Sequence, residues 1–287
     1  MSTQAECVTV LQTEFERLKQ YLATLPADAW TKPSACALWE VRDVVAHLIF
    51  EANYYTDWIT RGLQEDTSTP EGRPEPGSFH TVSQEERQQI ATAAAQRMIA
   101  FRERLGQELL DVFGHTGDHF NDLVARLSPH EWESPCSDAR GMLPVRFLVR
   151  AMLFERAMHG WDIRSALEPS AHLSPDALAV ILEHVAACLH RRFLPGARLP
   201  TPVRYRFACT GTLNHTWDIV VEGDTAHMAP ATDATPANTT FACARETLAL
   251  LIYGRMGFDA ALSDKHLIPT GDMAVVQAFK QWFPNAW

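Results

Sequence analysis

The stretch from about Pro144 to Leu167 constrains the fold most, because it is long, apolar and helical in its periodicity. Alternating steps of four and three residues place six side chains on one helical face: Leu148, Met152, Glu155, His159, Asp162 and Ala166. Three successive ionisable groups on an apolar face are costly to bury unless they are paired or bind a cation. The stretch therefore predicts a buried helix with a polar centre.

Four helical stretches are expected in the first part of the chain, which suggests a four-helix bundle. They cover residues 3–25, about 40–63, about 83–127 with an interruption around Gly114 and Gly117, and about 144–167. The spacing of Ser83 to Glu86 fits a capping box at the start of the third stretch. The segment Asp66–Ser78 is rich in Pro, Gly, Ser and Thr and predicts an exposed loop.

The periodicity changes in the second part of the chain. A helix from about Pro175 to Phe193 leads into the proline-rich sequence PGARLPTP, after which apolar residues alternate with polar ones. Strands are expected around Val203–Phe207, Trp217–Val221, Thr225–Ala229 and Phe241, and helices at Arg245–Tyr253 and Met273–Trp282. Arg204 and Arg206 are expected to face solvent. The predicted fold is α+β, with a helical bundle over residues 1–170 and a small α+β domain over residues 171–287.

One divalent metal ion would explain the polar centre of the bundle. Glu155 and His159 are four residues apart and can point at one position, and His47 interrupts the apolar face of the second predicted helix. If the two helices face each other, two imidazoles and one carboxylate form a three-ligand site with an open position, which is the catalytic pattern for zinc. Asp43 and Asp162, each about one turn from a histidine, could orient the rings.

Spacing alone leaves alternatives open. His115 and His119, in the segment GHTGDHFND, are also four residues apart and have two aspartates nearby. The glycines of this segment weaken the helix that would align them. The histidines of either set could instead be hydrogen-bonded core residues or partners in local ion pairs. Residue spacing ranks the two candidate sets about equally.

Two sequence signatures separate these candidates. The stretch PSACALWEVRDVVAHL, residues 33–48, resembles the N-terminal metal-binding domain of mycothiol-dependent maleylpyruvate isomerases, a family within the DinB-like four-helix bundles; the matching residues are Pro33, Cys36, Trp39, Asp43 and His47. The stretch FERAMHGWDIRSAL resembles the second signature, Glu-x-x-x-His-x-x-Asp, on Glu155, His159 and Asp162. The resemblance implies that His47, Glu155 and His159 hold a divalent metal, with zinc preferred.

The resemblance extends to the C-terminal part. LALLIYGR and the later GDMAVVQAF are similar to the sterol-carrier-like domain of these proteins, and Arg255 matches a recurring arginine that is implied to approach an acidic substrate. Arg255 and Asp162 are accordingly our candidates for assisting catalysis, although Arg255 could also be a surface residue near a helix end. Two departures from the family pattern are the long proline-rich loop and Ala37-Leu38, which stands where Pro-Gly is frequent.

These residues suggest metal-assisted thiol chemistry. A low-molecular-weight thiol, mycothiol or another, would attack a small electrophilic substrate that bears a carboxylate, such as maleylpyruvate. Addition to a cis double bond permits rotation, and expulsion of the thiol leaves the trans isomer; a transferase would keep the adduct. A thiol-independent metal hydrolase and a non-catalytic small-molecule or lipid-binding protein are the alternatives.

Composition excludes several other partners. The net charge of −10 argues against nucleic acid, and no apolar run is long enough to span a bilayer. The polar N-terminal sequence lacks the layout of a secretory signal, so we expect a cytoplasmic protein whose partners are a thiol and a small substrate. The six cysteines contain no CxxC pair and are expected to pack as small apolar residues, and Trp39 and Trp161 are expected in the core.

Overall fold

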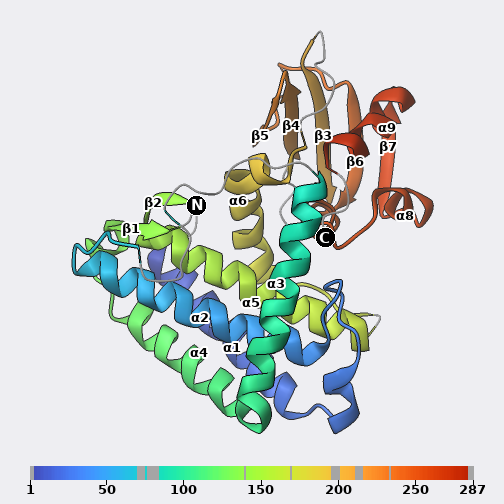
Figure 1. Cartoon of the computed structure of the whole chain (residues 1–287). Coiled ribbons are helices and arrows are strands. Elements are labelled where there is room, and N and C mark those ends of the chain that lie inside the picture. Colours follow the sequence, from blue (N-terminus) through green and yellow to red (C-terminus); the bar gives the residue numbers. More distant parts are fainter. Residues whose placement is uncertain are drawn as a thin grey trace. The chain divides into compact units, whose positions relative to one another are not determined.

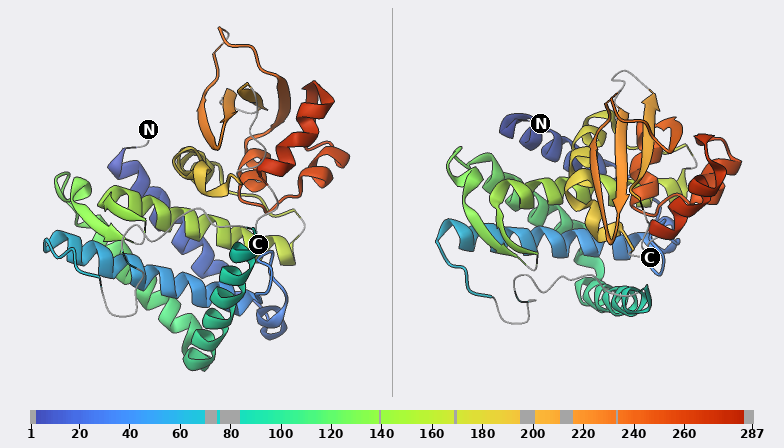
Figure 2. Two further views of the ribbon diagram at one scale, coloured as in Figure 1. Left: turned by 45° about the horizontal axis from the view of Figure 1, so that its top comes forward. Right: turned by 90° about the horizontal axis from the view of Figure 1, so that it is seen from above.

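The structure, a computed structural model, describes residues 3–69, 75, 84–138, 140–168, 170–194, 201–210, 216–232 and 234–283. The chain forms two compact units, Met1–Val180 and Ile181–Trp287, and the division falls inside helix α6 (Pro175–Arg192) (Figures 1 and 2). The predicted α+β class is confirmed, because helices form the first unit and a sheet with helices forms the second. The domain boundary expected between residues 170 and 171 stays a prediction.

A bundle of helices forms the first unit. It consists of α1 (Gln4–Ala23), α2 (Val41–Leu63), α4 (Leu109–Ala125) and α5 (Val145–Leu167), and α3 (Gln84–Leu105) packs beside α2 (Figure 1). A capping box between Thr3 and Glu6 begins α1, and its apolar stripe is buried at Leu11, Phe15, Leu18 and Leu22. The first, second and fourth predicted helices are therefore confirmed.

The third predicted helix is two helices, and its break was predicted at the wrong glycines. The chain turns at Gly106, which has a φ of +55° and begins a short 3-10 helix between α3 and α4. Gly114 and Gly117 lie inside the continuous helix α4. Gly117 is buried because α1 approaches it closely there: a Cβ on this residue would lie 2.0 Å from Cε2 of Phe15. This glycine therefore serves helix packing and does not interrupt the helix.

Two further predictions concern residues near the start of the third helix. Most of the loop expected at residues 66–78 lies outside the described residues, and so does Ser83, which we expected to cap the helix.

Among the described residues, no helix combines the length and apolar character needed to cross a bilayer.

A buried arginine ties three bundle helices together. Arg156 on α5 is 1% exposed and donates hydrogen bonds to the side chain of Asn121 at 2.6 Å and to the backbone carbonyl of Leu11 at 3.1 Å. Its guanidinium also lies over the rings of Phe15 and Phe120, at 4.6 and 5.4 Å. These contacts compensate the cost of burying the charge, so the core of the bundle contains a fixed cation.

A short hairpin precedes α5. Strands β1 (Pro135–Asp138) and β2 (Gly141–Pro144) pair antiparallel, and Arg140 in the turn donates two hydrogen bonds to the buried Asp138, at 2.5 and 3.0 Å. The guanidinium of Arg140 lies 5.6 Å from the ring of Tyr55 on α2. The hairpin, which sequence periodicity did not predict, thus fixes a positive charge beside α2.

The second unit contains a five-stranded sheet with the order β5-β4-β3-β6-β7, in which only β3 and β6 pair in parallel among the described strands. The elements are β3 (Val203–Thr210), β4 (Thr216–Glu222), β5 (Thr225–Pro230), β6 (Thr239–Ala244), α7 (Arg245–Ile252), α8 (Phe258–Ser263), β7 (Leu267–Gly271) and α9 (Met273–Trp282). An aromatic cluster packs between sheet and helices, formed by Tyr205, Phe207, Phe241, Phe258 and Phe279.

The prediction that Arg204 and Arg206 face solvent is wrong. Both are partly buried and pair with Asp218 of β4, which is fully buried: Arg204 donates at 3.0 Å, and Arg206 at 2.9 and 3.0 Å. Burial raises the pKa of Asp218, but the two guanidinium groups outweigh it and hold this pKa below its usual value. The alternation of apolar and polar residues identified the strand correctly. It could not show that a buried aspartate on the neighbouring strand pairs with the two arginines.

Candidate metal centre

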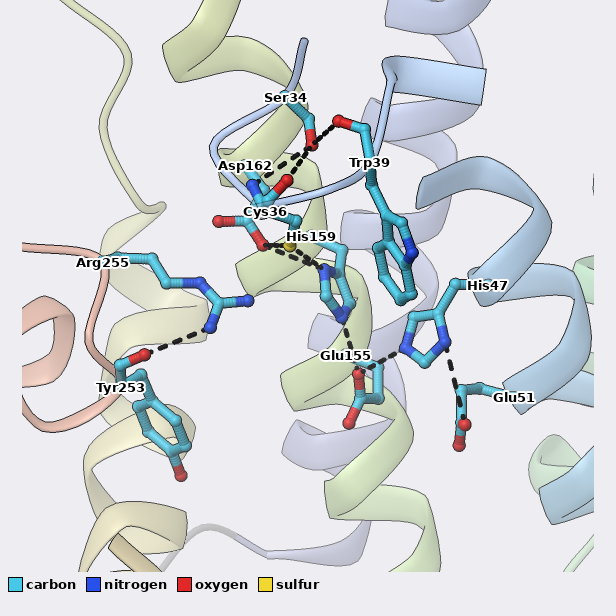
Figure 3. A network of polar contacts seen from close by, with 10 residues as sticks. All are labelled: Ser34, Cys36, Trp39, His47, Glu51, Glu155, His159, Asp162, Tyr253 and Arg255. Atoms are coloured by element: carbon cyan, nitrogen blue, oxygen red, sulfur yellow. Dashed lines mark hydrogen bonds and ion pairs between the residues drawn. The ribbon is translucent and has the colours of Figure 1, made fainter. Parts of the chain in front are cut away.

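Three side chains converge between α2 and α5 in the first unit. Nε2 of His47 lies 3.3 Å from Oε2 of Glu155, and Nε2 of His159 lies 3.0 Å from the same oxygen (Figure 3). The two imidazole rings meet edge to face, with their centroids 4.6 Å apart. The structure therefore brings together the three residues that we expected to hold a metal.

The helices explain this convergence. Glu155 and His159 are one helical turn apart on α5, and α2 packs against α5 so that His47 faces them. His159 is 7% exposed, and the side chains of His47 and Glu155 are 16% and 19% exposed. Buried apolar residues lie next to them in both helices, among them Leu48 on α2 and Met158 on α5. The cluster is thus a largely enclosed polar site within the bundle.

The electrostatics of the cluster are strongly coupled. Burial raises the pKa of Glu155, but hydrogen bonds with His159 and His47 outweigh it and hold the pKa well below its usual value. Burial lowers the pKa of His159, but Cys36, Asp162 and Glu155 outweigh it and hold this pKa well above its usual value. In the metal-free protein the carboxylate is therefore ionised and a proton on His159 balances its charge.

The other ring nitrogens face acidic side chains. Nδ1 of His159 lies 2.9 Å from Oδ2 of Asp162, and Nδ1 of His47 lies 3.9 Å from Oε1 of Glu51 (Figure 3). Burial raises the pKa of Glu51 despite the opposing charges of His47 and Arg140. Asp162 thus occupies the orienting position that we predicted. Glu51 is the residue facing the second ring, and its place one turn after His47 on α2 was the signal that could have identified it.

Asp43 does not occupy the position that we expected. Its Oδ1 accepts a hydrogen bond from Nε of Arg102 on α3 at 2.9 Å, and its Oδ2 accepts one from the backbone amide of Glu40 at 3.0 Å. The second contact belongs to a capping box that begins α2. Asp43 therefore fixes the start of this helix and its contact with α3, and the prediction that it orients His47 is wrong.

Cys36 lies in the loop before α2 and contacts the orienting pair. Its thiol donates to Oδ2 of Asp162 at 3.0 Å and lies 3.5 Å from Nδ1 of His159 (Figure 3). The backbone amide of Ala35 donates to the carbonyl of Asp162 at 3.0 Å, so the loop is anchored to α5. Nothing in the spacing of the chain assigned this contact, because it depends on the loop conformation.

The two tryptophans lie outside the core, contrary to our prediction. Trp39 is partly buried, and its ring centroid lies 5.0 Å from that of His47 and 6.1 Å from that of His159. Its indole Nε1 is buried without a hydrogen-bond partner in the described part of the chain. Trp161 is also partly buried and donates to the carbonyl of Ala171 at 3.2 Å. Only Trp39 therefore covers the candidate centre.

The donor set suits a divalent cation. Among the described residues, two groups of three side chains bring their ligand atoms close enough to hold an ion: His47, Glu155 and His159, and Cys36, His159 and Asp162. The first group offers two imidazole nitrogens and a carboxylate oxygen, which are the donors that zinc prefers at catalytic sites. His115 and His119 are exposed on α4 and belong to neither group.

Arg255 belongs to the second unit and follows α7 in a turn. Its Nη1 donates to the carbonyl of Tyr253 at 3.1 Å, and the residue is partly buried (Figure 3). The other predicted site residues belong to the first unit. The contribution of Arg255 to catalysis therefore stays a prediction.

The fold and the cluster define a class of protein: a helical bundle with a candidate metal centre, joined to a sterol-carrier-like domain. The model of the mycothiol maleylpyruvate isomerase N-terminal domain family matches residues 11–164, and the chain belongs to this family. The model of the SCP-2 sterol transfer family matches residues 201–284. Both matches confirm the resemblance on which the sequence analysis relied.

Solved structures share this arrangement of elements. The crystal structure of the mycothiol-dependent maleylpyruvate isomerase is 13% identical, covers 89% of this chain and 90% of its own, and gives a TM-score of 0.55. A point mutant of that isomerase gives a TM-score of 0.56 with the same identity and coverage. No curated protein matches the sequence. At this identity the structural likeness shows the fold alone.

Proposed function

We propose that the protein is a metal-dependent, thiol-dependent isomerase or S-transferase that acts on a small electrophilic substrate, with maleylpyruvate as the first substrate to test. The observation that carries the proposal is the convergence of His47, Glu155 and His159 on one position. Membership of the isomerase family supports the thiol, and mycothiol is the first candidate.

The three side chains would hold a divalent cation, for which zinc suits the donors best. When bound, the cation supplies a Lewis acid that favours the thiolate form of a thiol near neutral pH. Asp162 accepts the Nδ1 proton of His159 and so directs the lone pair of Nε2 toward the cluster. The indole of Trp39 packs beside both imidazole rings and helps to shield them from water.

The reaction consists of bond changes at one carbon–carbon double bond. The thiol sulfur forms a bond to an electrophilic carbon, and the electron pair of the double bond moves to the adjacent carbonyl group. Rotation about the resulting single bond, followed by expulsion of the thiolate, gives the trans isomer. If a proton instead traps the adduct, the reaction is an S-transfer. Arg255 would pair with a substrate carboxylate, because a guanidinium fits a carboxylate in a bidentate arrangement.

A metal assay tests the first half of this proposal. We expect the purified protein to retain about one zinc ion per chain after dialysis, and His47→Ala to lose both the metal and the activity. His119→Ala is the matched control, because His119 is exposed on α4 and lies in neither ligand group. A protein without stoichiometric metal, or full activity in His47→Ala, would contradict the metal centre.

A thiol screen tests the second half. Maleylpyruvate is incubated with the protein and mycothiol, glutathione or bacillithiol, and the products are separated by mass and retention. Isomerisation or adduct formation with at least one thiol is expected. Turnover without any thiol would support the metal hydrolase alternative, and inactivity with every thiol would support a binding protein. Arg255→Lys should raise KM more than it lowers kcat while metal content stays unchanged.

A further inference from the structure

A second group of possible ligands lies at the other ring nitrogen of His159. Sγ of Cys36 is 3.0 Å from Oδ2 of Asp162 and 3.5 Å from Nδ1 of His159, and this nitrogen is 2.9 Å from the same oxygen (Figure 3). Around a tetrahedral ion of the size of zinc, such donors lie about 3.3–3.7 Å apart. A cation therefore fits between these three atoms once they separate by about half an ångström.

The charges of this group suit a divalent cation. A thiolate and a carboxylate together carry two negative charges, so they neutralise such an ion within the protein. Asp162 is fully buried, and an uncompensated charge there would be costly. The thiolate also makes the group soft, and soft ligands select thiophilic ions over magnesium or calcium. The group thus differs in chemistry from the first one, which offers two imidazoles and one carboxylate.

The group can be reached from solvent. Cys36 is partly exposed, and its neighbours in the loop, Ala35 and Ala37, are exposed. The loop is held in place, because the amide of Cys36 donates to the hydroxyl of Ser34 at 3.1 Å and the amide of Ala35 donates to the carbonyl of Asp162 at 3.0 Å. The other cysteines whose side chains are described are all buried: Cys7, Cys136, Cys209 and Cys243. Cys36 is therefore the described thiol best placed to capture an ion.

One imidazole serves both ligand groups. Nε2 of His159 faces Glu155, whereas its Nδ1 faces Cys36 and Asp162. A neutral imidazole has one lone pair on its ring nitrogens, so His159 offers it either at Nε2 or at Nδ1. An ion bound at Nδ1 leaves a proton on Nε2, which donates to Glu155 and occupies the ligand oxygen. Occupation of the second group therefore opposes occupation of the first.

We propose that Cys36, Asp162 and Nδ1 of His159 form a second cation site, which binds thiophilic divalent ions and thereby expels an ion from the first group. Binding displaces the thiol proton and the proton on Nδ1, and both pass to solvent. The competition rests on the proposed function, because it requires a metal at His47, Glu155 and His159. Binding of a thiophilic ion to the second group does not require it.

The test uses the full-length protein and cadmium as the probe. Cadmium added to chelator-treated protein should produce an ultraviolet sulfur-to-cadmium charge-transfer band, which Cys36→Ser should lose. Cys243→Ser is the matched control and should keep the band, because it disrupts the other described pair of adjacent thiols, Cys209 and Cys243. His47→Ala should also keep the band although it loses zinc, since His47 belongs to the first group alone.

Competition between the groups is measured on zinc-loaded protein. Cadmium should release zinc as the charge-transfer band appears, and a zinc indicator follows the release. A band without release of zinc would mean that both groups fill together, which rejects the competition. A protein that shows the band but never binds zinc would contradict the proposed function and leave the second cation site standing.

Other results would overturn the second site itself. Cadmium binding without the band, or an undiminished band in Cys36→Ser, would place the ion elsewhere, and loss of the band in Cys243→Ser alone would assign it to the sheet. Alkylation of the unmodified protein with iodoacetamide gives a readout that does not depend on a variant's folding. Cadmium should slow alkylation of Cys36, located by peptide mapping, whereas magnesium should not. Equal alkylation rates with the two ions would also reject the site.

Discussion

Nδ1 of His159 lies 2.9 Å from Oδ2 of Asp162, while Nε2 of the same ring lies 3.0 Å from Glu155. The two nitrogens of this imidazole thus contact two different carboxylates: Nδ1 contacts the orienting Asp162, and Nε2 contacts the candidate ligand Glu155. Asp162 is fully buried, so water competes little for its oxygens. A proton held on Nδ1 leaves the lone pair of Nε2 directed at the cluster.

Replacing Asp162 should therefore weaken metal binding without removing a proposed ligand. For Asp162→Asn we expect roughly 10–100-fold weaker zinc binding, because the amide holds the ring orientation and basicity less well. Competition against a chromophoric chelator measures this. Asp122→Asn, an exposed residue of α4, is the control. Unchanged affinity in Asp162→Asn would mean that the carboxylate does not act on the metal through His159.

Cys36 should contribute to the same orientation. Its thiol donates to Oδ2 of Asp162, so Cys36→Ala removes one hydrogen bond from the orienting carboxylate. A bond of this kind contributes about 1 kcal/mol, so we expect roughly fivefold weaker zinc binding. Cys36→Ser retains a donor and should bind nearly as tightly as the unmodified protein. Equal losses in the two variants would indicate that sulfur itself, and not the hydrogen bond, matters.

The raised pKa of His159 predicts a pH effect on the metal-free protein. The folded pKa lies above the unfolded value of about 6.5, so protonation of His159 stabilises the fold below that value, and this contribution disappears as pH rises through the folded pKa. The difference in unfolding free energy between the metal-free protein and His159→Gln should therefore shrink as the pH rises from about 6.5 through the raised folded pKa of His159. Denaturant unfolding in the presence of a metal chelator measures this free-energy difference. A difference that stays constant with pH would show that the pKa of His159 is not raised in the folded protein.

Glu155 contributes in the opposite pH range. Its folded pKa lies well below the unfolded value of about 4.3, so its stabilisation is present above that value and is lost as the pH falls through the folded pKa. Acid therefore removes the carboxylate's contribution, and alkali removes that of His159. Both effects should diminish on zinc addition, because a bound cation replaces the proton of His159 as the partner of Glu155.

The convergence of the candidate ligands could be predicted from the sequence because most of the cluster is local. Glu155, His159 and Asp162 lie on consecutive turns of one helix, where spacing alone determines the shared face. The choice of His47 over His115 and His119 was different, since helical spacing does not say which helices face each other. That choice depended on the family resemblance, which the family match supports.

The features that sequence reasoning missed depend on contacts between distant segments. Arg156 resembles a surface residue in the sequence, yet its partners come from α1 and α4. Cys36 reaches Asp162 only because its loop folds back onto α5. Arg206 alternates like a solvent-facing strand residue, but its partner Asp218 is buried on the adjacent strand. Periodicity identifies the face of an element, whereas tertiary packing decides what covers that face.

The loop that carries Cys36 contains a strained residue. Leu38 has a φ of +72° and is 60% exposed. A left-handed conformation costs a residue with a side chain about 1–2 kcal/mol, while little apolar burial is lost on truncation. We expect Leu38→Gly to be roughly 1 kcal/mol more stable than Leu38→Ala, which keeps the strain. Equal unfolding free energies of the two variants would show that the loop relaxes.

Gly117 and Gly114 of α4 should respond oppositely to alanine. A Cβ on Gly117 would lie 2.0 Å from Cε2 of Phe15, and that ring is fully buried against the guanidinium of Arg156. Since the ring cannot move away freely, Gly117→Ala should destabilise the protein by about 1–3 kcal/mol. A Cβ on Gly114 would meet only Cε of Lys19 at 3.6 Å, so Gly114→Ala should gain up to about 1 kcal/mol from helix propensity. Urea unfolding measures the free energy of unfolding of both variants. If both are destabilised, α1 must pack closely against α4 at Gly114 as well as at Gly117.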